Sequence, residues 1–162
     1  SYISEYDDLS QLLNRRGFME RASHAIESNS GQKAYLLFGD LDHLKEINDC
    51  FSHLAGDFAL RTVSERLRKC LPKDAITARL GGDEFVSFIL TDMPDFKEQL
   101  LQSLKKESDA FNASCDKPFY VEISVGIYEF YCNPQMDLTD ILKHSDAILY
   151  EEKAKRRASI KK

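Results

Sequence analysis

The chain has 162 residues, a suitable length for one domain that buries about 70% of the surface exposed by its unfolded form. Its 27 acidic and 22 basic residues give a net charge of −5, which argues against a nucleic-acid partner because phosphate backbones require a basic face. No apolar run approaches the roughly 20 residues that span a bilayer, so we expect this domain to make no membrane contact.

The first helix is predicted to begin after Asn14, which is a good N-cap residue, and to end before Gly31. Its apolar residues recur at helical spacing, at Phe18, Ala22 and Ile26. Residues 33–42 form a short apolar run bounded by turn residues, which predicts a buried strand. Residues 55–71 place Leu60, Val63 and Leu67 on one helical face and predict the next helix.

Residues 75–90 are predicted to form two strands around Gly81 and Gly82, a dipeptide that can adopt the positive φ of a tight turn. A further helix follows, with an apolar stripe at Phe96, Leu100 and Leu104. Residues 119–130 alternate as a strand. The last helix is predicted to begin at Asp137.

The order of these elements is helix, strand, helix, hairpin, helix, strand, helix. Without the first helix, the order contains β-α-β-β-α-β, which is the ferredoxin-like arrangement of the α+β class. We therefore expect an antiparallel-rich sheet with helices packed on one face and an extra helix at each end of the chain.

Two acidic stretches lie where this fold would bring them together. Asp40 and Asp42 end the first strand, and Asp83 and Glu84 occupy the hairpin bend. Crowded carboxylates raise one another's pKa unless a cation compensates, and Mg²⁺ binds one or two carboxylates while keeping positions for phosphate and water. Taken singly, each stretch is more often a plain turn or a solvated loop, but together they favour a metal site.

The four cysteines, at positions 50, 70, 115 and 132, show no CxxC spacing. They are typical of free thiols in a reducing compartment, so we expect a cytoplasmic domain, which can still belong to a membrane-anchored protein.

Several motifs resemble those of the GGDEF family, the diguanylate cyclases, which condense two GTP into cyclic di-GMP and pyrophosphate. The stretch RLGGDEF resembles the family signature, and DDLSQLLNRRGF resembles its opening motif. DLDHLKEINDCFSHLAGD, EISVGI and SDAILYEEKAKRR resemble later motifs in the same order. The resemblance implies a nucleotide-cyclase or polymerase-palm-like fold, with residues 1–162 as one GGDEF domain cut from a longer protein that carries an N-terminal sensory or regulatory domain.

The resemblance also implies roles for individual residues. Asp40, Asp83, Glu84 and the carbonyl of Leu41 would bind two Mg²⁺ ions per active site, with Mn²⁺ as an alternative. Asp83 and Glu84 would be the catalytic pair, with Glu84 holding metal or helping to deprotonate the attacking ribose 3′-hydroxyl.

The other implied roles concern GTP. Asn48 and Asp57 would hydrogen-bond the guanine edge, which presents two donors to a carboxylate. The triphosphate would be bound by the side chains and backbone of Lys45, Lys153, Arg157, His43, Leu44, Gly81 and Gly82. Alternatively, Asn48 ends a short helix, Asp57 is a first-turn acid and Lys153 lies on a solvated helix face.

One domain would hold one GTP, so turnover would require a second GGDEF domain in a homodimer, and the isolated domain could be monomeric. The alternative is a catalytically inactive, GTP-binding regulatory domain.

The chain departs from the family pattern at several positions. Gln11 and Ser52 replace glycines, Ser52 in a loop that would be strained if it needs positive φ, and Arg156 changes the closing helix. Pro72 and Ala75 stand where many members carry the Arg and Asp of a product-binding inhibitory site. We therefore predict no product inhibition through that site.

Overall fold

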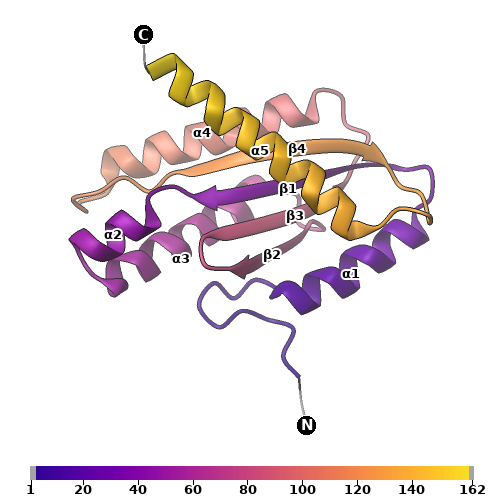
Figure 1. Ribbon diagram of the computed structural model, residues 1–162, viewed down its shortest axis with the longest axis horizontal. Helices are drawn as coiled ribbons and strands as arrows, with labels where there is room; N and C mark the ends of the chain where they lie inside the picture. Colours follow the sequence, from indigo (N-terminus) through magenta and orange to yellow (C-terminus); the bar gives the residue numbers. More distant parts are fainter. Residues whose placement is uncertain (1–2, 161–162) are drawn as a thin grey trace.

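The computed structural model describes residues 3–160, which form five helices and four strands (Figure 1). The strands are β1 (Lys33–Leu41), β2 (Ile76–Gly81), β3 (Glu84–Leu90) and β4 (Ile123–Tyr131). The helices are α1 (Arg15–Ser28), α2 (Leu44–Cys50), α3 (His53–Cys70), α4 (Phe96–Ser114) and α5 (Leu138–Ile160). No helix among these is long and apolar enough to cross a membrane.

The strands form one sheet in the order β2-β3-β1-β4, and every neighbouring pair is antiparallel. This order confirms the predicted α+β, ferredoxin-like arrangement. The central strand β1 pairs with β3 on one side and with β4 on the other. The sheet therefore places the end of β1 beside the start of β3.

Helices cover both faces of this sheet, which corrects the prediction of a single covered face. Alternate residues of β1 point to opposite sides: Ala34, Leu36 and Phe38 pack with α1 and α5, whereas Tyr35 and Leu37 pack with α3 and α4. In Figure 1, α5 accordingly crosses in front of the sheet, α1 lies below β2 at the lower right, and the fainter α3 and α4 lie behind the sheet. The helices α1 and α5 supply the second layer, which explains why β1 is continuously apolar from Ala34 to Phe38.

Local signals account for most helix ends. The Asn14 side chain caps α1 by accepting a hydrogen bond from the Gly17 N–H at 2.9 Å, as predicted. Asp137 does the same for α5 through the Thr139 N–H. The fourth strand begins at Ile123 rather than at residue 119, because the Val121 N–H bonds to the Asn112 side chain of α4 instead of to a strand.

Candidate functional site

The acidic stretches meet at one end of the sheet. Asp40 of β1 lies directly opposite Glu84 of β3, the first residue after the hairpin turn. The Leu41 N–H donates to the carbonyl oxygen of Asp83 at 2.9 Å, so the turn is attached to the end of β1. Gly81 and Gly82 form the bend with φ of 140° and 50°, values that side chains other than glycine rarely allow.

Charge repulsion and burial act on these carboxyls. Burial, followed by the negative charge of Asp40, raises the pKa of Asp83 above its usual range. The pKa of Glu84 is raised by burial and by the charges of Asp40 and Asp83. A bound cation would lower the free energy of all three ionised groups.

Lys153 of α5 supplies one positive charge at this place. Its Nζ lies 2.7 Å from Oδ2 of Asp40, and the two side chains are 32% and 20% exposed. The other carboxylate oxygen, Oδ1 of Asp40, is buried and has no hydrogen-bond partner. Such an orphaned oxygen is costly unless a further positive group reaches it.

The residues fit a magnesium site. Among residues 3–160, no group of three or more acidic, histidine or cysteine side chains is already gathered around one point. Mg²⁺ does not need such a cage, because it uses one or two carboxylates and completes its shell with water and phosphate. The free oxygen of Asp40 and the raised pKa values of Asp83 and Glu84 suit that donor set.

Close packing of α5 against β4 positions Lys153. A side chain at Gly126 of β4 would come within 2.3 Å of the Leu149 nitrogen and 2.8 Å of the Ser145 carbonyl oxygen. The absence of a side chain therefore lets the helix approach the sheet closely enough for Lys153 to reach Asp40.

Arg156 and Asp42 belong to the same end of the sheet; sequence reasoning placed Asp42 in the acidic stretch but not among the metal ligands, and it gave Arg156 no role. The Ser124 hydroxyl donates to Oδ1 of Asp42 at 2.6 Å, and Arg156 lies 4.0 Å from Oδ2 of Asp42 and contacts Ser124. Arg156 departs from the family pattern, and that departure was the one sequence feature that could have drawn attention to its position near the site. Arg157 is exposed and, within residues 3–160, makes no hydrogen bond or ion pair with any of these groups.

The two predicted guanine contacts lie close together. Asn48 is near the end of α2 and Asp57 is in the first turns of α3, and both are partly buried. A side chain at Gly56 would collide with Oδ1 of Asn48 at 1.9 Å, so Gly56 makes room for that amide. Ser52 caps α3 by accepting from the Ala55 N–H at 3.0 Å, and its φ of 178° is ordinary extended backbone.

The substitution at Ser52 thus causes no strain. Gln11, by contrast, has a φ of 63° in the left-handed region that favours glycine, so this departure does carry a backbone cost.

The predicted phosphate contacts around α2 are exposed. His43 adopts a φ of 62° at the N-terminal end of α2, and its side chain is 80% exposed. Lys45 is exposed, whereas Leu44 packs against the core. The backbone N–H groups of His43 and Leu44 at the start of α2 lie three and four residues after Asp40, close enough in the chain to share one ligand with it.

Comparison with known proteins gives a consistent set of matches. A family model described as "Diguanylate cyclase, GGDEF domain" matches residues 4–159. PdeR of Escherichia coli K12, a cyclic di-GMP phosphodiesterase, is 31% identical and covers 93% of this chain. Diguanylate cyclase DgcP of Pseudomonas aeruginosa PAO1 is 33% identical and covers 91%. The chain spans only 23% and 22% of these two relatives.

Among solved structures, a sensory box/GGDEF family protein from Caulobacter crescentus CB15 is 30% identical to this chain, with a TM-score of 0.76. The match covers 94% of this chain and 99% of the solved one.

Proposed function

Since the chain belongs to the GGDEF family of diguanylate cyclase domains, we propose that it condenses two GTP into cyclic di-GMP and two pyrophosphate. The observation that carries this proposal is the pairing of Asp40 with Glu84 beside an intact acidic turn, with one oxygen of Asp40 left unpartnered.

In this proposal Asp40, Asp83, Glu84 and the Leu41 carbonyl hold two divalent ions, Mg²⁺ or Mn²⁺. When bound, such ions neutralise phosphate charge and lower the pKa of the attacking 3′-hydroxyl. Glu84 takes part in accepting the hydroxyl proton, because burial and its acidic neighbours have already raised its pKa toward the working range of a general base.

Nucleotide binding uses the residues around α2, α3 and α5. Asp57 and Asn48 accept from and donate to the guanine edge, which discriminates against adenine because adenine N1 is an acceptor. Lys45, Arg157 and the backbone N–H groups of His43 and Leu44 contact the triphosphate. When GTP and metal bind, the Lys153 ammonium leaves the Asp40 carboxylate and contacts a phosphate oxygen instead.

Turnover in this proposal requires two copies. Each domain binds one GTP, and the 3′-hydroxyl of one must reach the α-phosphate of the other, so the sites face each other in a homodimer. The chain spans less than a quarter of the two curated relatives, and we infer that a preceding regulatory domain controls this pairing in the cytoplasm.

A second candidate function is GTP binding without catalysis. The Lys153–Asp40 ion pair favours it, because a lysine that stays on Asp40 would compete with the metal. PdeR, a relative of similar identity, carries the name of a phosphodiesterase, so a match to this family does not by itself establish cyclase activity.

The test is to fuse the domain to a dimeric coiled coil and incubate it with GTP and Mg²⁺. We expect pyrophosphate release and cyclic di-GMP, and a rate at least about 100-fold lower for Asp83→Ala, since losing a metal ligand removes several kcal/mol of transition-state stabilisation. Asp92→Ala, an exposed acid just after β3, is the matched control and should leave the rate unchanged. GTP binding by calorimetry without any product would select the regulatory function.

A further inference from the structure

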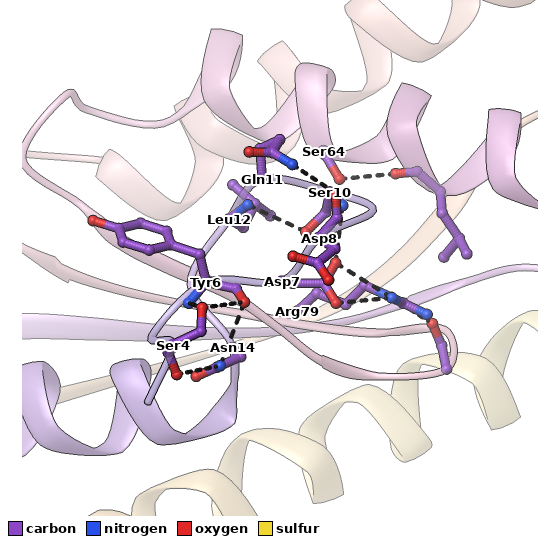
Figure 2. Close-up of polar contacts among 12 residues, drawn as sticks. Ser4, Tyr6, Asp7, Asp8, Ser10, Gln11, Leu12, Asn14, Ser64 and Arg79 are labelled. Atoms are coloured by element: carbon purple, nitrogen blue, oxygen red, sulfur yellow. Dashed lines mark hydrogen bonds and ion pairs between the residues drawn. The ribbon is translucent and has the colours of Figure 1, made fainter. Parts of the chain in front are cut away.

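One arginine connects the segment before α1 to the acidic turn (Figure 2). Nη1 of Arg79, on β2, lies 3.1 and 3.3 Å from the two carboxylate oxygens of Asp7. Nε of the same guanidinium donates to the Gly82 carbonyl at 2.9 Å. The planar guanidinium holds its separate donors in a fixed geometry that suits both contacts at once, whereas a lysine ammonium is a point charge on a flexible stem.

Asp7 is itself held in a closed loop. Its backbone N–H donates to the Leu12 carbonyl at 2.7 Å, and its carbonyl accepts from the Gln11 N–H at 2.8 Å. Its carboxylate also accepts from the Ser10 N–H at 2.9 Å. Burial would raise the pKa of Asp7, but the hydrogen bonds from Ser10 and the charge of Arg79 outweigh it and hold the pKa below its usual value.

The loop is also docked onto the folded domain. The Leu13 N–H donates to Thr77 of β2 at 3.3 Å, and the Arg79 N–H donates back to Leu13 at 2.9 Å. Arg68 of α3 donates to the Ser10 carbonyl at 2.6 Å. Because these hydrogen bonds join the segment to β2, a displacement of the segment would also displace Arg79.

The turn has few other attachments. A side chain built on Gly81 or Gly82 would meet no atom within 4 Å, so the bend is surrounded by open space. On the β1 side it is held by the Leu41 hydrogen bond to Asp83, and on the β2 side by Arg79. The Arg79 and Asp7 side chains are only 15% and 21% exposed, so their ion pair is less screened by solvent than a surface pair.

We propose that Asp7 and Arg79 are positioning residues that set the acidic turn, so that displacement of the segment before α1 changes catalysis at Asp83 and Glu84. The catalytic part of this inference rests on the proposed function. The inferred regulatory domain would connect through this segment, which gives its signal a route to the metal ligands.

The experiment compares Asp7→Asn and Arg79→Lys with a matched control, Glu5→Gln. Glu5 belongs to the same segment and pairs with Arg21 of α1 at 3.2 Å, without touching the turn. The first readout is amide hydrogen exchange at Leu41, whose N–H bonds to the turn. We expect exchange about tenfold faster or more in both test variants, since each loses a charge-assisted hydrogen bond, and no change in the control.

The second readout is steady-state kinetics of the dimer-fused protein. We expect kcat to fall about tenfold while the KM for GTP stays within about twofold, because the guanine contacts lie elsewhere. Unchanged exchange at Leu41, exchange accelerated equally at all amides, or faster exchange with unaltered kcat would each overturn the inference. If both variants exchange faster than the parent at Leu41 but the parent itself shows no turnover, the result supports the link between the segment and the turn. It then refutes the proposed function instead.

Discussion

At the scale of single residues, the two carboxyls of the acidic turn lie in an environment that disfavours their ionised forms. Burial and neighbouring charge raise the pKa of both Asp83 and Glu84, so the ionised carboxyls oppose folding. Function-bearing sites are commonly unfavourable in this way.

The sign of the resulting pH dependence can be worked out. A raised pKa in the folded state means that these groups stabilise the fold only below their ordinary values of 3.8 and 4.5, and that this contribution is lost as the pH rises through the raised values. Without divalent ions, Asp83→Asn and Glu84→Gln should therefore unfold at higher temperature than the parent near neutral pH. The gain should vanish as the pH falls toward the ordinary values.

Thermal unfolding in a chelating buffer across this pH range checks the prediction. Asp92→Asn serves as the exposed control and should show no gain. A loss of stability near neutral pH that disappears toward low pH would instead show that the two carboxyls are stabilising when ionised.

At the scale of elements, much of the fold could be predicted from sequence because the signals were local. The N-cap at Asn14, the glycine turn and the apolar stripe of α4 each lie within a few residues of what they specify. The short helix α2 entered the prediction only through the alternative role of Asn48 and was missing from the predicted order of elements, because its start depends on a left-handed His43 that no residue preference indicates. The later start of β4, at Ile123 instead of the predicted residue 119, is set by a hydrogen bond to Asn112, which belongs to another element.

The packing of α5 on β4 gives a prediction at this scale. Gly126→Ala should lower the free energy of unfolding by about 3 kcal/mol, because the new methyl group would overlap the backbone of α5 at Leu149. Urea denaturation measures the change. Gly31→Ala is the matched control, since it introduces the same methyl group into open space at a φ of 84° and should cost only about 1 kcal/mol.

An equal cost at positions 31 and 126 would show that backbone conformation, rather than the approach of α5, determines the loss. A large loss confined to Gly126→Ala should be accompanied by weaker nucleotide binding, since Lys153 is carried on the same helix.

At the scale of the whole molecule, the candidate site combines groups from distant parts of the chain. The pairing of Asp40 with the acidic turn followed from the predicted order of strands and could be foreseen. The ion pair of Lys153 with Asp40 could not, because it depends on how a terminal helix crosses the second face of the sheet, and no single-sequence pattern specifies that crossing.

At this scale we also predict that the proposed product, cyclic di-GMP, does not inhibit the domain through the inhibitory site found in many family members. Pro72 and Ala75 line a cavity of about 540 Å³ between the N-terminal segment and β2, but neither side chain can replace the charged pair of an inhibitory site. We expect the initial rate of the dimer-fused protein to stay unchanged when cyclic di-GMP is added in excess. Inhibition accompanied by chemical-shift changes at residues 72–75 would contradict this expectation.

The lysine at Asp40 has one more consequence. Its ammonium is a counterion supplied by the chain itself, so it offsets part of the electrostatic cost of burying the Asp40 carboxylate. Under the proposed function, divalent ions would therefore bind and dissociate without unfolding the domain, and the displaced Lys153 ammonium would become available to the phosphate that accompanies the metal.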